Sequence, residues 1–399
     1  MGDFTFNEFE TASIGYAQMT TSSKGAFAKV LSKRDFDDAY HEITSWQGYQ
    51  PTPLYHLDDI AQAIGVDDIL YKDEGPRFGL ASFKALGGAY AAIRVLQRVL
   101  SARLEQEVSM ADIRQGLYQK ECRSITLVSA TDGNHGRSLS WGCQRYGAPC
   151  RIYIHAEVSE GRADIMRGFG ADVVRITGDY DESVRLAKQE ADKHGWYVVS
   201  DTSWEGYSEP PRDVMAGYGV MVSEINYEVD EAPTHVFLQG GVGGLAAGVA
   251  AALRHYWQGA SPRVVIVEPE LAACLYQSAS KGAAVSVEIE TETIMAGLSC
   301  GEPSEMAWQV LAEEAGDYLT IPDTLVGPMV RMLACPAGSD TPIKAGESAV
   351  AGLCALVAAR KDKALSKKLG LDASSRVLII GSEGITDQEI YDEIMRGAL

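Results

Sequence analysis

The stretch THVFLQGGVGGLAAG, residues 234–248, joins an apolar run to a glycine cluster and then to small residues that favour a helix. A continuous apolar run is typical of a strand buried on both faces of a parallel sheet. Glycines at the start of a helix leave bare backbone N–H groups beside the positive end of the helix dipole, which favours binding of a phosphate group. A tight turn with close helix–strand packing also requires glycine. We favour the phosphate site because the glycines cluster within 240–244.

The same alternation of apolar runs and helical stretches recurs along the chain. The other runs lie at 124–130, 150–156, 171–177, 196–201, 263–269 and 376–384. This pattern predicts an α/β fold with two doubly wound, mostly parallel sheets. Ligands of such sheets bind beyond the carboxyl ends of the strands. Polar or glycine-rich turns follow four of the runs and could therefore line one shared site. These turns are 131–137, 202–207, 242–248 and 382–387.

The distribution of the runs predicts two domains. Residues 96–204 contain four runs and would form a small domain, while residues 1–95 and 205–399 would form a large cofactor-binding domain. Residues 1–50 are expected to be an extension that packs on the body of the protein or on a partner subunit.

Charge and composition narrow the classes of function. The 399 residues carry a formal net charge of −20, which argues against binding to nucleic acid or to an anionic membrane. No run of about 18 apolar residues is present. The acidic start of the chain, MGDFTFNEFETAS, does not resemble a secretory signal. The seven cysteines form no CxxC pair and no zinc spacing, so we expect reduced thiols, a cytoplasmic location and no metal.

A single lysine, Lys84, lies within the apolar, glycine-rich stretch RFGLASFKALGGAYA (77–91). One interpretation is a helix whose lysine lays its stem on the protein and keeps its charged head in water. The other is a lysine beside a ligand, where desolvation lowers the pKa and makes the amine a nucleophile. The stretch by itself favours the first interpretation.

Two further segments carry reactive side chains directly after apolar runs. The turn 131–137 combines Asp132, Asn134 and His135, although Asp-Gly and Asn are also ordinary turn formers. Asp201 ends the run WYVVSD, where an aspartate is usually a helix N-cap. The position of the loop after a buried strand favours a functional role for it.

The glycine-rich stretch also matches a dinucleotide-binding fingerprint. Gly241, Gly243 and Ala246 have the required spacing, and Glu268 ends the next apolar run. An NAD-dependent oxidoreductase is therefore an alternative, although it leaves Lys84 unexplained. A nucleoside triphosphatase is not supported, because the chain contains no GxxxxGK[ST] loop.

Three motifs together resemble a known family. SFKALGGAYA (82–91) preceded by KDE (72–74), the loop 129–136 and GGVGG (240–244) occur in the order found in the tryptophan-synthase-β-like, or fold-type II, pyridoxal phosphate enzymes. Within that group the chain resembles the diaminopropionate ammonia-lyases over nearly its whole length. This likeness is carried by YQPTPL (49–54), KDEGPRFGLASFKALGGAY (72–90), SATDGNHGRSLSW (129–141), DTSWEGY (201–207), TIMAGLSCGEPS (293–304) and KAGESAVAG (344–352).

The resemblance implies that pyridoxal 5'-phosphate binds between the two domains. Lys84 would bind the cofactor aldehyde covalently, Asn134 would bond the ring hydroxyl, and Phe83 would pack on the ring. Ser382 would face the pyridine nitrogen, although the sequence around it departs from the SGG motif common in dehydratases. The phosphate would be held by Gly240, Gly241, Val242, Gly243 and Gly244.

The resemblance also implies elimination from D- and L-2,3-diaminopropionate to pyruvate and two molecules of ammonia, by a homodimer. The isomers present their α-hydrogens to opposite faces, so one base cannot reach both. Lys84 would serve the L-isomer, and Asp132, helped by Asp201, would serve the D-isomer. Cys274 and Cys300 would lie near the entrance, either bridged or as free thiols.

Two alternatives share the implied fold. The more similar alternative is a serine or threonine dehydratase, but the acid at position 132 and the RFGL segment before the lysine motif argue against it. A non-catalytic binding protein would retain the cofactor without turnover. The intact set of lysine, acid and amide argues against that second alternative.

Overall fold

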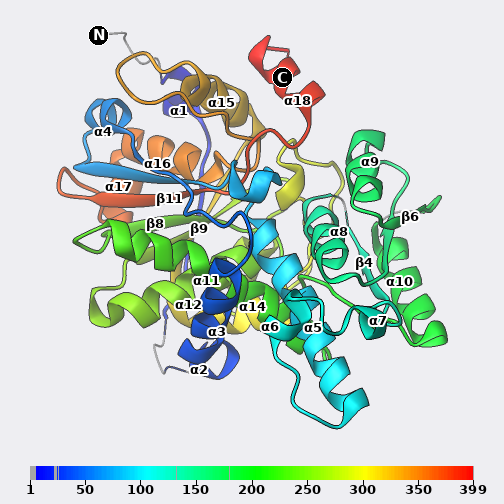
Figure 1. Cartoon of the computed structure of the whole chain (residues 1–399). Helices are drawn as coiled ribbons and strands as arrows, with labels where there is room; N and C mark the ends of the chain where they lie inside the picture. Colours follow the sequence, from blue (N-terminus) through cyan, green and yellow to red (C-terminus); the bar gives the residue numbers. More distant parts are fainter. Residues whose placement is uncertain (1–5, 22–24, 26, 132, 179, 399) are drawn as a thin grey trace. The chain divides into compact units, whose positions relative to one another are not determined.

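The computed structural model describes residues 6–21, 25, 27–131, 133–178 and 180–398 (Figure 1). Contacts divide the chain into two compact units. The first unit combines the residues up to 33 with 50–82 and 221–399, and the second combines 34–49 with 83–220. The second unit is therefore larger than the predicted small domain, since it also contains 34–49, 83–95 and 205–220.

The extra segments belong to the second unit because they pack closely within it. Helix α5 (Lys84–Leu104) lies along α8 (Asn134–Tyr146), and a Cβ on Gly142 would lie 2.8 Å from the Cα of Ala89. A Cβ on Gly217 of α11 (Glu209–Glu228) would lie 2.3 Å from the carbonyl oxygen of Leu86. Glycine at these positions allows the backbones to approach directly.

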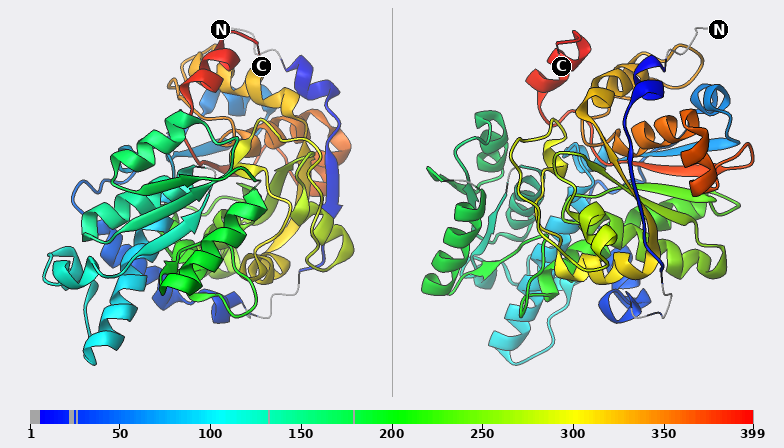
Figure 2. Two further views of the ribbon diagram at one scale, coloured as in Figure 1. Left: turned by 90° about the vertical axis from the view of Figure 1, so that its right-hand side faces the viewer. Right: turned by 180° about the vertical axis from the view of Figure 1, so that it is seen from behind.

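The first unit contains a seven-stranded sheet in the order β1-β10-β9-β8-β11-β3-β2. Its amino-terminal strand β1 is the dark-blue arrow in Figure 2. The five inner strands are parallel, while β1 and β2 are antiparallel edge strands. This arrangement confirms the prediction of a mostly parallel sheet. The strands are β1 (Gly15–Gln18), β2 (Leu54–His56), β3 (Asp68–Asp73), β8 (His235–Gln239), β9 (Arg263–Pro269), β10 (Ala315–Ile321) and β11 (Arg376–Gly381).

Helices cover both faces of this sheet. Figure 1 shows α4, α16 and α17 on one face and α12 and α14 on the other. The α-helices are α1 (Asn7–Thr11), α2 (Phe27–Val30), α4 (Asp58–Ile64), α12 (Gly244–Trp257), α13 (Cys274–Lys281), α14 (Glu305–Glu314), α15 (Val326–Ala334), α16 (Ala351–Lys361), α17 (Lys363–Leu369) and α18 (Gln388–Met395). Short 3₁₀ turns are η1 (Arg77–Gly79), η2 (Gln258–Ala260), η3 (Ala296–Leu298) and η4 (Asp323–Leu325).

The amino-terminal segment packs on the body of the first unit. Phe6 and Phe9 are buried in the same apolar cluster as α16, and β1 pairs with β10. The prediction of an extension that packs on the body is confirmed for these residues.

The second unit contains a parallel four-stranded sheet in the order β6-β5-β4-β7. All four strands lie within predicted runs: β4 (Leu127–Ala130), β5 (Cys150–Ile154), β6 (Asp172–Arg175) and β7 (Tyr197–Val198). Helix α10 (Tyr180–His194) packs on one face, where Val128, Tyr153, Ala187 and Ala191 form an apolar cluster. Besides α5, α8 and α10, the helices are α3 (Lys33–Thr44), α6 (Met110–Arg114), α7 (Gln119–Cys122) and α9 (Glu160–Gly168), with α11 shared between the units.

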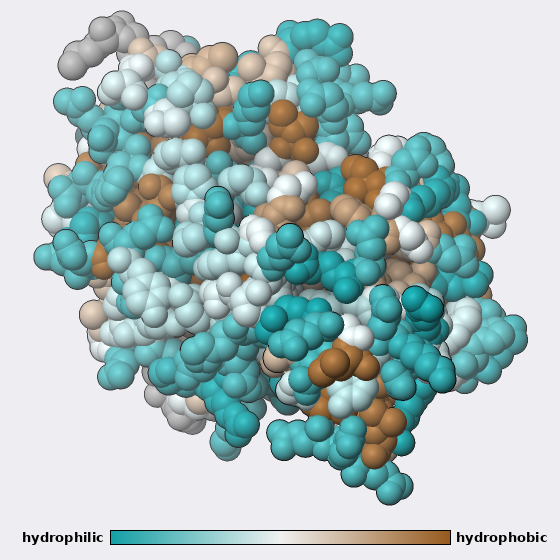
Figure 3. Space-filling model, in the orientation of Figure 1, coloured by the Kyte–Doolittle hydropathy of each residue, from teal (hydrophilic) through white to brown (hydrophobic). Residues whose placement is uncertain are grey.

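Hydrophilic residues predominate on the face drawn in Figure 3, as expected for an acidic chain. Large apolar side chains that remain exposed include Leu117 and Tyr227. None of the helices in the described ranges is long and apolar enough to span a membrane.

A buried ion network in the first unit holds the segment that leads from β3 to α5. The Arg77 guanidinium donates to both oxygens of Glu74 at 2.7 and 2.8 Å and to both oxygens of Glu224 at 2.7 and 2.8 Å. Lys72 lies 2.8 Å from Glu224 and donates to the carbonyl of Thr52 at 2.7 Å. All four charged side chains are at most 1% exposed. Every charge in the network thus has an opposite partner.

Arg77→Met is expected to lower the free energy of unfolding by about 3–5 kcal/mol, because it leaves buried carboxylates without their guanidinium partner. Urea denaturation monitored by circular dichroism measures this loss. Arg167→Ala, which removes an exposed arginine paired with Glu160, is the matched control and should leave the midpoint nearly unchanged. Equal effects of the two substitutions would contradict the structural role of the network.

Candidate active site

Lys84 is the first residue of α5 and reaches the turn that follows β7. Its Nζ forms an ion pair with the Asp201 carboxylate, and the two side chains are 21% and 17% exposed. The amine therefore faces a carboxylate within the second unit, which argues against a lysine that merely extends into water. Asp201 is the ion partner of Lys84. This contact agrees with its prediction as a site residue rather than only a helix N-cap.

His135 completes this cluster. Its Nε2 lies 2.9 Å from the carbonyl oxygen of Val199, and its Nδ1 lies 4.0 Å from a carboxylate oxygen of Asp201. A carbonyl only accepts, so Nε2 carries the hydrogen and the neutral ring has its lone pair on Nδ1. In the sequence, His135 belongs to the turn 131–137, but no local motif marks it as catalytic.

Burial and charge set the ionisation of the cluster. Burial lowers the pKa of His135, and the nearby Lys84 adds to this effect while Asp201 opposes it. Burial alone would raise the pKa of Asp201, but the Lys84 ammonium and His135 hold it well below its ordinary value. The cluster therefore combines an ammonium, a carboxylate and a neutral imidazole near pH 7.

Aromatic rings border the lysine. Phe83, just before Lys84, is buried and packs on Tyr218 with ring centroids 4.7 Å apart. The Tyr218 hydroxyl is buried and has no hydrogen-bond partner among the described residues, and burial raises its pKa. A Cβ on Gly87 would lie 2.6 Å from the Tyr218 ring, so glycine is required there. The sequence carried no signal for Tyr218.

The loop after β4 is described in part. Asp132 lies outside the described residues, so the structure neither supports nor opposes its assignment as a base. Asn134 begins α8, directly after β4 and its turn.

In the first unit, the glycine loop 240–244 joins β8 to α12. Gly241 and Gly243 have φ values of 69° and 93°, a region that side-chain-bearing residues seldom adopt. Gly243 is the N-cap of the 14-residue helix α12 and offers no capping side chain. The first N–H groups of the helix are therefore left for another acceptor, as in anion sites.

Ser382 follows β11, which pairs with β8, so Ser382 and the glycine loop lie at the carboxyl ends of neighbouring strands. The buried Gln239 amide lies between them, since its Nε2 donates to the carbonyl of Ile380 at 2.6 Å and lies 3.5 Å from the Ser382 hydroxyl. The Gln239 Oε1 has no partner among the described residues. The four polar turns predicted to share one site thus form two neighbouring pairs, β4 with β7 and β8 with β11.

Glu268 does not have the role that a dinucleotide site requires. Its carboxylate is fully buried and accepts the backbone N–H groups of Leu275 and Tyr276 at 3.1 and 2.7 Å. It is therefore bonded to the start of α13 and unavailable to a ribose hydroxyl. Neither Cys274 nor Cys300 forms a disulfide bond in the structure.

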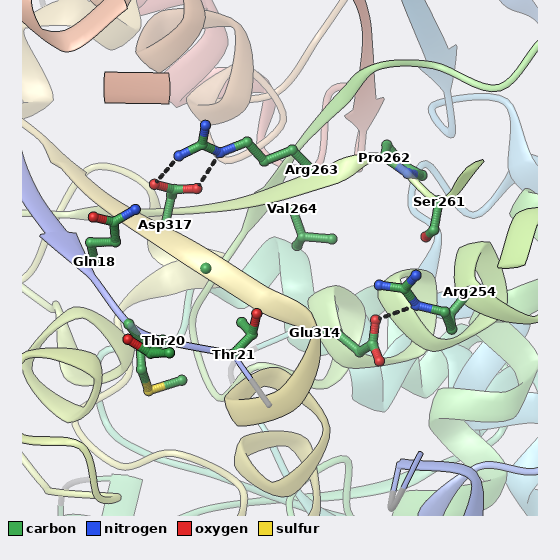
Figure 4. A pocket seen from close by; sticks show the side chains of 12 residues that line it. Gln18, Thr20, Thr21, Arg254, Ser261, Pro262, Arg263, Val264, Glu314 and Asp317 are labelled. Atoms are coloured by element: carbon green, nitrogen blue, oxygen red, sulfur yellow. Dashed lines mark hydrogen bonds and ion pairs between the residues drawn. The ribbon is translucent and has the colours of Figure 1, made fainter. Parts of the chain in front are cut away.

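A cavity of about 630 Å³ lies at the amino ends of β9 and β10 (Figure 4). Two ion pairs, Arg254 with Glu314 and Arg263 with Asp317, line it. None of the predicted site residues that the structure describes is part of its lining. It lies at the opposite end of these strands from the glycine loop.

One group of three side chains in the described residues has metal-ligating atoms close together: His56, Asp58 and Asp68. The group lies at the edge strand β2, and His56 is 3.0 Å from Asp68. Two of the three side chains are exposed, and the contact is an ordinary surface pair.

Comparisons with known proteins agree with the likeness seen in the motifs. The family model described as "Pyridoxal-phosphate dependent enzyme" matches residues 45–383. Diaminopropionate ammonia-lyase from Escherichia coli K12 is 39% identical over 354 residues, which are 87% of this chain and 88% of that protein. The Escherichia coli enzyme solved with an aminoacrylate–PLP azomethine intermediate has a TM-score of 0.85 and 35% identity over 97% of this chain and 98% of its own. The same enzyme solved with D-serine has a TM-score of 0.86, with the same identity and coverage.

We expect His135 to stay neutral, with its hydrogen on Nε2, in buffers more acidic than the ordinary histidine pKa of about 6.5. The reasons are its burial and the bond to Val199. NMR of protein labelled with ¹⁵N-histidine measures both tautomer and titration, and His135→Gln identifies the resonance by its loss. A hydrogen on Nδ1, or a titration midpoint at or above 6.5, would contradict this assignment.

Proposed function

The chain belongs to the fold-type II family of pyridoxal-phosphate-dependent enzymes, and we propose that it converts D- and L-2,3-diaminopropionate to pyruvate and two molecules of ammonia. The reaction is a pyridoxal-phosphate-dependent elimination by a carbon–nitrogen lyase. The observation that carries the choice of substrate is the 39% identity with diaminopropionate ammonia-lyase over 87% of the chain.

The described residues fit this cofactor. The uncapped start of α12 and the positive φ values of the glycine loop suit a phosphate group. Lys84 supplies an amine for the aldehyde, and the buried Tyr218 hydroxyl and Gln239 Oε1 are polar atoms that have no partner in the described part of the chain. When bound, the cofactor accepts the electrons that remain when a bond to the substrate Cα breaks.

We assign the predicted residues the following tasks. Gly240, Gly241, Val242, Gly243 and Gly244 bind the phosphate. Lys84 holds the cofactor and, once released, exchanges a proton at Nζ. Asn134 donates to the ring hydroxyl, Phe83 limits the movement of the ring, and Ser382 faces the ring nitrogen. A neutral hydroxyl at Ser382 leaves that nitrogen without a proton, whereas a carboxylate would favour its protonation.

Asp201 has two uses that its geometry supports. Its carboxylate keeps the Lys84 ammonium oriented, which is what a proton carrier requires. When Lys84 is bonded to the cofactor, the Asp201 carboxylate can instead bind the β-ammonium group of 2,3-diaminopropionate. Serine offers a hydroxyl at that position, so an ionised Asp201 favours the diamine.

Two bases account for turnover of both isomers. Lys84 serves the α-hydrogen of the L-isomer, and Asp132, supported by Asp201, serves that of the D-isomer. The assignment of Asp132 rests on the sequence likeness alone, because this residue lies outside the described part of the chain.

A second candidate is elimination from D-serine, favoured by the solved complex of the Escherichia coli enzyme with D-serine. An NAD-dependent oxidoreductase is disfavoured by the bonds that hold Glu268 to α13.

We further propose that the chain works in the cytoplasm as a homodimer, the commonest symmetric assembly. Light scattering coupled to size-exclusion chromatography tests the dimer.

The function is tested by pyruvate release from D- and L-2,3-diaminopropionate, serine and threonine, assayed side by side. We expect rapid release from both diaminopropionate isomers and slow release from the hydroxy amino acids. Activity on the hydroxy amino acids alone would mean that the family is right and the substrate wrong.

Lys84→Ala should abolish all release, and borohydride reduction should no longer fix the cofactor to the peptide that contains residue 84.

Asp132→Asn is expected to lower turnover of the D-isomer by about 10²- to 10⁴-fold, the usual contribution of a positioned base. The L-isomer, served by Lys84, should lose much less. Steady-state kinetics on each pure isomer measures the difference, and the exposed Asp192→Asn on α10 is the matched control. Equal losses on both isomers would disprove the two-base arrangement.

A further inference from the structure

Glu268 is the one feature of the dinucleotide-like pattern that the proposed function leaves without a role. It is the next-to-last residue of β9 and lies beside the first residue of the glycine loop, because the Gly240 N–H donates to the carbonyl of the neighbouring Val267 at 2.8 Å. A Cβ on Gly240 would lie 2.4 Å from the Glu268 Cγ and 3.1 Å from its Oε1. The carboxyl group therefore lies against the loop backbone.

A second contact path joins Glu268 to the loop through α13. The Cys274 thiol lies 3.4 Å from the carbonyl oxygen of Gly241 and 3.7 Å from the Glu268 carboxyl. The following N–H groups, of Leu275 and Tyr276, donate to the same carboxyl. Glu268 thus fixes the start of α13, and α13 in turn holds the loop through Cys274.

No cation pairs with Glu268 among the contacts of the described residues. Burial raises its pKa to about 8, although three hydrogen bonds from α13 act in the opposite direction. Other titratable groups that face this site are Cys274 and, from β10, Tyr318, and burial raises the pKa of both. Cys300 faces Cys274 and the loop. Glu268 is therefore the carboxyl group of this cluster whose charge changes near pH 8.

We propose that Glu268 is a positioning residue whose neutral form lets the glycine loop hold a phosphate group, and whose carboxylate form weakens that hold. This inference rests on the proposed function, because it takes the loop as the cofactor-phosphate site. The reason is electrostatic: a buried carboxylate against Gly240 repels a phosphate dianion on the loop, with little screening by water. Binding of phosphate above pH 8 would therefore be accompanied by uptake of a proton at Glu268.

The test compares holoenzyme of the wild type with Glu268→Gln, which is neutral at every pH and nearly the same shape. Each protein is dialysed between pH 6.5 and 9.5 at constant ionic strength, and released pyridoxal phosphate is measured by absorbance. The dissociation constant of the wild type should rise, relative to the variant, by up to about tenfold per pH unit above about pH 8. Below that pH the ratio of the two constants should be flat.

Glu314→Gln is the matched control, since Glu314 is a buried carboxylate at the end of α14, paired with Arg254 at the far end of the sheet. It should follow the wild-type pH dependence. Parallel profiles of the wild type and Glu268→Gln would overturn the role of Glu268 while leaving the proposed function standing. Failure of every protein to retain the cofactor at any pH would overturn the proposed function, and the inference with it.

A measurement on the wild type alone covers the case in which Glu268→Gln does not fold. Calorimetry in two buffers of different ionisation enthalpy counts the protons taken up when pyridoxine 5'-phosphate, which has no aldehyde, binds to the cofactor-free full chain. Uptake should approach one proton at pH 9 and be close to zero at pH 7. Unphosphorylated pyridoxine should show no such uptake, and absence of uptake with the phosphate at pH 9 would overturn the proposal.

Discussion

The ion network around Arg77 constrains the segment on which the rest of the candidate site depends. Residues 74–82 run from the end of β3 to the start of the helix that carries Lys84, and two residues of this segment, Phe78 and Ala81, have positive φ values without being glycine. Such backbone is costly and persists only where its surroundings hold it. Arg77 supplies four hydrogen bonds to buried carboxylates, and the segment is also bonded to the residues after β11.

The same bonds locate Ser382. Glu74 donates its N–H to the carbonyl of Gly381, and Gly384 donates to the carbonyl of Ala81. The turn after β11 is therefore held against the segment 74–82, within the first unit. A serine proposed to face the ring nitrogen is thus supported on one side by the network and on the other by Gln239. Rigid support of this kind is what a cofactor-binding residue requires, because small displacements reduce its effect.

The amino-acid pattern predicted those parts of the fold that depend on continuous apolar runs. Strands β4 to β9 and β11 lie within predicted runs, whereas β3 and β10 were missed because each contains a buried charge, Lys72 or Asp317. Their ion partners, Glu224 and Arg263, are distant in sequence, so no local pattern shows that these charges are neutralised. The site follows the same rule. Lys84 and the glycine loop were predicted from local motifs, while His135 and Tyr218 were not assigned because only packing places them beside Lys84.

Asp201 and Glu268 show how the neighbours of a carboxyl group determine whether it is charged or neutral. The Glu268 carboxyl is fully buried and that of Asp201 is partly buried, and burial alone raises the pKa of each. Asp201 lies against the Lys84 ammonium, so it stays ionised and can orient an amine. Among the described residues, Glu268 has only backbone N–H groups and a thiol as partners. Burial raises its pKa to about 8, so it is largely neutral at pH 7. A negative charge beside the lysine assists chemistry on amines, whereas a negative charge behind the glycine loop would oppose a phosphate. The choice of partner for each carboxyl therefore matches the charge of the ligand group that we assign to its neighbourhood.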